Sequence, residues 1–72
     1  MTVATIAVTI NGREAEIPAG LNIAGLLEHR GVQTTMVAVE HNGRVLRRTE
    51  FPDVTVSAGD KLEIVHFVGG GD

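Results

Sequence analysis

Hydrophobic and polar residues alternate along the first part of the chain, as in β-strands that bury one face. Residues 3–10 alternate isoleucine and valine with threonine, and residues 13–18 alternate apolar residues with glutamate. Asn11-Gly12 lies between the two segments. Asn-Gly is typical of a two-residue hairpin turn, because both of its residues tolerate a positive φ. The pattern therefore predicts an antiparallel hairpin.

The hydrophobic period then changes to that of a helix. Ile23, Leu26 and Leu27 recur at helical spacing. Asn22 is a good N-cap, since its side chain accepts hydrogen bonds from N–H groups of the first turn. Gly31 stands where a left-handed residue would close the helix. The sequence predicts one short helix that packs its apolar side against a sheet.

The second half of the chain predicts another hairpin and a final strand. Residues 36–41 are rich in valine and lead through Asn42-Gly43 into residues 44–47. Residues 49–56 are irregular, with one predicted turn of helix and one very short strand. Residues 61–68 form the last strand. This order predicts an α+β domain, a ubiquitin-like β-grasp with a mixed sheet of four to five strands packed on one helix.

The last strand carries apolar residues on both of its faces. Leu62 and Ile64 fall on one face, and Val65 and Phe67 extend the other. Because one helix covers one face of a two-layer domain, we expect the first pair to meet the helix and the second to be partly exposed. An exposed apolar patch beside a chain end predicts a protein-docking site at Val65, Phe67 and Val68. The alternative is that the irregular segment at residues 49–56, which we call the crossing segment, covers these side chains.

This strand runs directly into Gly69, Gly70 and Gly71. Glycine has no Cβ, so such a run can thread a narrow channel and present a carboxylate to another protein's active site. The sequence predicts a β-grasp domain over residues 1–68 and a flexible tail over residues 69–72, whose end is the working part. A frayed tail without a function is the alternative.

Composition and charge narrow the classes of function. The chain has 72 residues, of which 43% are apolar, which indicates one small domain with a compact core. Without cysteine, and with three scattered histidines, no metal site is expected. A net charge of −3 and two aromatic residues argue against a nucleic-acid partner. The lack of a membrane-length apolar run or a secretory signal predicts a cytoplasmic protein that does not bind membranes.

Several segments together resemble a known family. They are the first Asn-Gly turn, the helix at 22–27, the hairpin at 37–43, the turn at 58–60 and, most specifically, residues 62–71. Over nearly its whole length the chain resembles the ThiS family, the sulfur carrier proteins of bacterial thiamine biosynthesis. The resemblance implies a carrier that partner enzymes modify, rather than an enzyme.

The resemblance implies that the working group is the carboxylate of a terminal glycine, Gly71, with Gly70 as the second choice. An E1-like enzyme of the ThiF type would adenylate it, using its own ATP and Mg²⁺, so no cofactor bound to this chain is implied. Sulfur from a cysteine desulfurase would replace AMP and give a thiocarboxylate. A thiazole synthase of the ThiG type would then take the sulfur for the thiazole ring.

Asp72 departs from this pattern, since it follows the glycine expected at the end. Three explanations stay open: a tail-processing hydrolase removes it, it is an addition to the natural chain, or the protein is a divergent carrier. The function also has alternatives. These are a MoaD-like carrier that supplies sulfur to molybdopterin or another metabolite, a β-grasp interaction module with an inert tail, and a ubiquitin-like modifier that forms isopeptide bonds.

Overall fold

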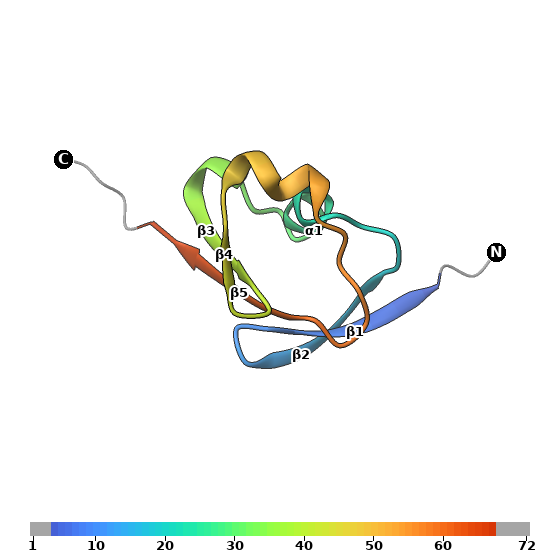
Figure 1. Cartoon of the computed structure of the whole chain (residues 1–72). Helices are drawn as coiled ribbons and strands as arrows, with labels where there is room; N and C mark the ends of the chain where they lie inside the picture. Colours follow the sequence, from blue (N-terminus) through green and yellow to red (C-terminus); the bar gives the residue numbers. More distant parts are fainter. Residues whose placement is uncertain (1–3, 68–72) are drawn as a thin grey trace.

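A computed structural model describes residues 4–67, which form a five-stranded sheet with one α-helix against it (Figure 1). The elements in chain order are β1 (Thr5–Ile10), β2 (Arg13–Pro18), α1 (Ile23–His29), the 3₁₀ helix η1 (Thr34–Met36), β3 (Val37–His41), β4 (Arg44–Leu46), the 3₁₀ helix η2 (Arg48–Asp53) and β5 (Lys61–His66). The strand order is β2-β1-β5-β3-β4. β5 pairs parallel with β1 and antiparallel with β3, so the last strand lies at the centre of a mixed sheet. The predicted β-grasp is confirmed.

Two Asn-Gly turns make the two hairpins, as their sequences predict. Asn11 and Gly12 have φ values of 52° and 81°, and Asn42 and Gly43 have values of 51° and 86°. Positive φ at both central residues matches the right-handed twist of the flanking strands. Each turn therefore keeps the apolar residues of its two strands on the same face of the sheet.

α1 begins and ends at the predicted capping residues. The side-chain oxygen of Asn22 accepts a hydrogen bond of 2.7 Å from the N–H of Gly25. At the other end Gly31 has a φ of 73°, and the N–H of Val32 donates to the carbonyl of Leu27 at 2.8 Å. This is the hydrogen bond of a Schellman cap. A helix of seven residues is too short to be stable alone, so its packing on the sheet must hold it in place.

The core lies between one face of the sheet, α1 and the segment around η2. Its buried side chains are Val8, Ile10, Ile17, Ile23, Leu26, Leu27, Val37, Val39, Leu46, Phe51, Val56, Leu62 and Ile64. Phe51 of η2 is only 2% exposed, so the irregular crossing segment is part of the same core. Figure 1 shows η2 on the α1 side of the sheet. Within residues 4–67, no helix or loop covers the opposite face of the sheet, which we call the open face.

Candidate docking face and chain exit

β5 is the last described strand and lies in the middle of the sheet, and we call its C-terminal end the chain exit. The N–H of Phe67 donates to the carbonyl of Met36 at 2.9 Å, so the backbone stays paired one residue beyond the strand. Residue Val68 of the predicted docking site lies outside the described residues, as do Gly69, Gly70 and Gly71. The predicted division between domain and tail and the choice of the modified glycine therefore stay predictions.

The side chain of Asn11 holds β5 against β1 beyond the end of their backbone pairing. The backbones pair at two positions, and the last of them joins Ile10 and Leu62. Beyond that point the Asn11 amide donates to the carbonyl of Ile64 at 3.1 Å and accepts from the N–H of Ile64 at 2.7 Å. An amide side chain can replace a backbone peptide group because it carries the same donor and acceptor. Sequence reasoning assigned Asn11 to its turn and missed this second contact.

A second group of side chains anchors the start of β5. The carboxylate of Asp60, only 9% exposed, accepts from the N–H of Ser57 at 2.8 Å and the amide of Asn42 at 3.2 Å. It also lies 2.7 Å from Nε2 of His41. The Asn42 oxygen accepts from the N–H of Lys61 at 2.8 Å. Sequence reasoning gave Asn42 no role beyond its turn, and that interpretation was wrong.

These contacts lower the pKa of the Asp60 carboxyl. Burial alone would raise this pKa, because it removes water from the charged form. The hydrogen bonds from Ser57, His41 and Asn42 stabilise the carboxylate and outweigh burial. The charged form of Asp60 therefore helps to hold the hairpin of β3 and β4 to β5 at neutral pH.

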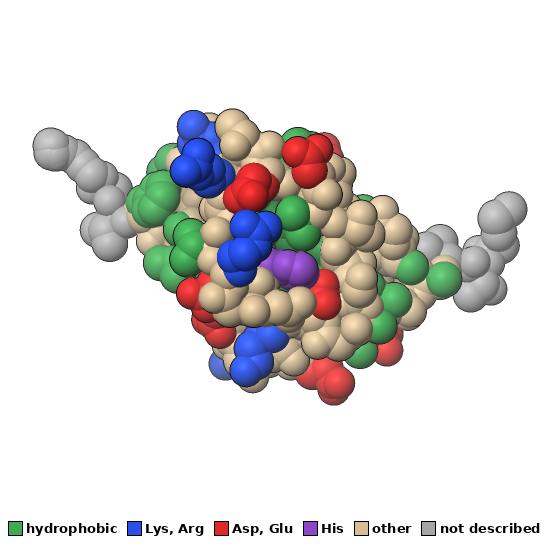
Figure 2. All heavy atoms as spheres, viewed as in Figure 1, with side chains coloured by type: hydrophobic (Ala, Val, Ile, Leu, Met, Phe, Trp, Pro, Cys, Tyr) green, Lys and Arg blue, Asp and Glu red, His purple; other side chains and the backbone are tan. Residues whose placement is uncertain are grey.

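The open face of the sheet presents the predicted docking residues to solvent. Val65 is 59% exposed and Phe67 is 55% exposed, so the alternative in which the crossing segment covers them is wrong. Val45 of β4 is also exposed, and Ala38 of β3 lies opposite Val65 in the antiparallel pairing. Figure 2 shows hydrophobic side chains gathered at the left of the view, where β5 ends in Figure 1. We call Ala38, Val45, Val65 and Phe67 the apolar patch.

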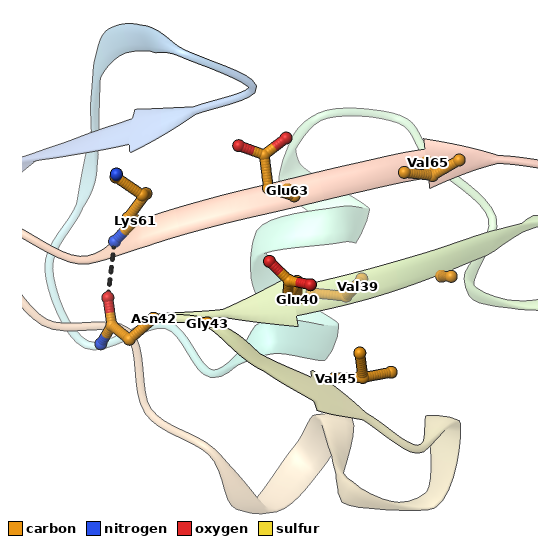
Figure 3. Close-up of a pocket in the computed structure, with 9 residues that line it drawn as sticks. Val39, Glu40, Asn42, Gly43, Val45, Lys61, Glu63 and Val65 are labelled. Carbon is orange, nitrogen blue, oxygen red and sulfur yellow. Dashed lines mark hydrogen bonds between the residues drawn. The ribbon is translucent and has the colours of Figure 1, made fainter.

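A hollow on the open face extends from this patch across β3, β4 and β5 (Figure 3). Val45 and Val65 lie at one end of the hollow and Lys61 lies at the other. Between them, Glu40 of β3 is directly opposite Glu63 of β5. The open face thus has an apolar end, close to the chain exit, and an acidic centre.

The remaining candidate groups do not gather into a site. His29 and His66 are exposed on α1 and β5, far in sequence from the hydrogen-bonded His41. Over residues 4–67, no three acidic or histidine side chains are arranged to bind a metal ion. No helix in the same range has the length and apolar character needed to span a membrane.

Comparison with known proteins connects this fold to a family. The ThiS family model matches residues 4–71. The thiazole synthase of Paramagnetospirillum magneticum is 44% identical over 62 residues, which cover 86% of this chain and 19% of that protein. The sulfur carrier protein ThiS of Bacillus subtilis is 37% identical over 49 residues, which cover 68% of this chain and 74% of that one. A crystal structure of thiamine biosynthesis protein ThiS from Geobacter metallireducens matches with a TM-score of 0.79 and 39% identity, over 92% of this chain and 100% of that one. The chain spans about a fifth of the length of the thiazole synthases that it matches.

Proposed function

The chain belongs to the ThiS family, and from this premise we propose that it is a cytoplasmic sulfur carrier of thiamine biosynthesis. In this role it is a substrate of partner enzymes and performs no catalysis itself. The observation that carries the proposal is the extent of the family match, which continues through the glycine run to residue 71. The exit of the chain from the central strand, beside the apolar patch, supports it.

The chemistry that we propose takes place on Gly71, with Gly70 as the second choice. A carboxylate is a poor electrophile because its negative charge is delocalised and its oxygen is a poor leaving group. An E1-like enzyme would join the carboxylate to the AMP portion of ATP and release pyrophosphate, with its own Mg²⁺ neutralising the phosphates. A sulfur donor would then displace AMP, and the resulting thiocarboxylate would pass its sulfur to a thiazole synthase.

We further propose that the apolar patch docks the adenylating enzyme. Val65 is exposed on the last strand and Phe67 just beyond its end, and Val68 follows them in the sequence. An exposed apolar group of this kind is characteristic of a protein-binding surface. The glycine run begins two residues after Phe67. Docking through these side chains would therefore bring the run close to the enzyme's active site.

Mass spectrometry tests the proposal on two purified proteins, one ending at Gly71 and one retaining Asp72. Each is incubated with the E1-like enzyme, ATP and a sulfur donor. We expect a gain of about 16 Da, from exchange of oxygen for sulfur, in the form ending at Gly71 only. With Asp72 in place the Gly71 carbonyl is an amide and has no carboxylate to activate, so a processing hydrolase would have to act first.

A matched control is Gly71→Ala in the shorter form, which keeps a terminal carboxylate and adds one methyl group. We expect it to be loaded more slowly, because a channel suited to glycine has no room for a Cβ. Equal loading of the intact Asp72 form, without proteolysis, would rule out both the processing step and the choice of Gly71. Transfer of sulfur to a thiazole synthase, rather than to a molybdopterin-forming enzyme, would separate this function from that of a MoaD-like carrier.

A further inference from the structure

We propose that Asn11 is a positioning residue for docking: by holding Ile64, it keeps the second half of β5 in the sheet and the side chains of the apolar patch together. The inference rests on the proposed function and names a residue outside the patch on which binding of the adenylating enzyme depends. Asn11 lies in the first hairpin turn and contacts the backbone of β5. Its effect on adenylation would therefore pass through the position of that strand.

β5 has a neighbouring strand on both sides only at its start. β1 pairs with it at Lys61 and Leu62 and then ends at the Asn11-Gly12 turn. β3 continues beside it from Leu62 to His66. The second half of β5 therefore has a strand along one side only.

The Asn11 side chain takes the place of the missing strand on the other side. Successive residues of a paired strand direct their peptide groups to opposite sides. The N–H of Phe67 donates to the carbonyl of Met36, just before β3, so the peptide groups of Ile64 point to the β1 side. There the Asn11 amide accepts from the Ile64 N–H at 2.7 Å and donates to its carbonyl at 3.1 Å. Within residues 4–67 these are the last hydrogen bonds on that side of β5.

The apolar patch depends on this arrangement because more than one strand builds it. Ala38 and Val45 come from β3 and β4, whereas Val65 and Phe67 come from β5 and the residue after it. Val65 lies opposite Ala38 in the pairing of β3 with β5. If the second half of β5 separates from β3, Val65 and Phe67 move away from Ala38 and Val45. The patch then no longer forms one surface.

Loss of the Asn11 contacts would raise the population of this separated state. Two hydrogen bonds of typical net strength shift a local equilibrium by a factor of about ten to a hundred. An enzyme that binds the ordered patch would then meet fewer competent molecules, and its apparent affinity would fall with that fraction. At saturation every bound molecule has the ordered patch. Asn11 should therefore affect the KM for the carrier much more than kcat.

The test compares matched substitutions in the two Asn-Gly turns. Asn11→Gly removes the contacts with Ile64, near the chain exit. Asn42→Gly, the control, removes contacts with Asp60 and Lys61, at the start of β5. Glycine accepts the positive φ at both positions, so both turns should survive. Because each variant loses the hydrogen bonds of one amide side chain, a general loss of stability should act on both.

Adenylation is measured as pyrophosphate release by the E1-like enzyme, on whichever form it accepts, the one ending at Gly71 or the one retaining Asp72. We expect Asn11→Gly to raise the KM for the carrier about fivefold and to leave kcat within about twofold of the parent. Asn42→Gly should have the KM of the parent. Asn11→Asp, which keeps an acceptor for the Ile64 N–H, should recover part of the affinity. Its KM carries the test if Asn11→Gly does not fold.

Amide exchange in the free proteins, followed by NMR, gives a readout that needs no enzyme. We expect exchange at Val65 and Phe67 to accelerate more in Asn11→Gly than in Asn42→Gly, because these amides point toward β3 and are released when the strand separates. Global destabilisation alone would not single out these two amides.

Three results would overturn the inference and leave the proposed function intact. They are a parental KM in Asn11→Gly, an equal rise in KM in Asn42→Gly, and unchanged exchange at Val65 and Phe67. A fall in kcat without a change in KM would also overturn it, because the role of Asn11 would then follow docking. Failure of the parent to release pyrophosphate in either form would overturn the proposed function and, with it, this inference.

Discussion

At the scale of single residues, Asp60 shows how a short side chain can connect distant elements. Its carboxylate contacts His41 and Asn42 from the second hairpin and the backbone of Ser57 in the preceding turn. No buried side-chain polar atom in the described part of the chain lacks a hydrogen-bond partner. A carboxylate with this many donors is expected to keep its charge and to make folding sensitive to acid.

We predict that Asp60→Asn destabilises the domain by about 1–3 kcal/mol at pH 7, because the amide presents an N–H₂ group to donors that need an acceptor. The pKa of Asp60 is lowered in the folded state. Its contribution to stability is therefore present above the unfolded pKa of about 3.9 and is lost as the pH falls through the folded value. The difference between the parent and the variant should shrink below about pH 4.

Urea unfolding of both proteins across this pH range provides the measurement. Asp53→Asn is the control, since Asp53 is exposed in η2, and we expect it to change stability little. A gap between the parent and Asp60→Asn that stays constant down to pH 2 would contradict the assignment.

At the scale of elements, one side chain extends the contact between β1 and β5. The two strands share a short backbone ladder, which the Asn11 amide continues to Ile64. Because β5 leads into the glycine run, this contact also holds in place the strand that precedes the run. The hairpin turn and the last strand are therefore coupled through a residue that serves both.

We predict that Asn11→Gly lowers the free energy of unfolding by about 1–3 kcal/mol through loss of these two hydrogen bonds. Glycine accepts the positive φ at this position, so the turn itself should survive. Asn11→Asp keeps an acceptor for the Ile64 N–H and loses the donor. Its free energy of unfolding should therefore lie between those of the parent and of Asn11→Gly. Amide exchange at Ile64, measured by NMR, should accelerate most in the glycine variant. Full protection of that amide in Asn11→Gly would show that the backbone ladder alone holds β5.

At the scale of the whole molecule, α1 and the segment around η2 cover one face of the sheet, and no other part of the described chain covers the opposite face. The two phenylalanines of the chain lie on opposite sides of this division. Phe51 is buried in the core on the α1 side of the sheet, whereas Phe67 is exposed on the open face. Their substitution therefore distinguishes the folding role of the core from the binding role of the open face.

We predict that Phe67→Ala costs less than about 1 kcal/mol of folding stability and weakens binding to the E1-like enzyme by about 2 kcal/mol. Phe51→Ala should instead cost about 3–5 kcal/mol of stability, a large share of what a small domain has. Thermal melting and titration calorimetry measure the two effects separately. A Phe67→Ala protein that fails to fold, or that binds as the parent does, would contradict the docking role.

The sequence by itself determined the elements whose signals are local. Asn-Gly requires its hairpin turn through the φ preferences of two adjacent residues, and Asn22 and Gly31 bound the helix through hydrogen bonds within one turn. The alternation of β5, combined with the presence of one helix, also predicted that Val65 and Phe67 would be exposed. Such signals act over a few residues, so a sequence pattern can predict them without knowledge of the neighbouring strands.

Only the tertiary structure decided which distant residues meet. Asn11 and Ile64 are 53 residues apart, and His41 and Asp60 are 19 apart. Glu40 opposes Glu63 only because β3 and β5 are neighbours in one particular register. Strand order and register follow from packing the apolar face against the helix, and a shift of one residue would turn every side chain of a strand to the other face. Burial of the whole core, rather than any local pattern, therefore brings these pairs together.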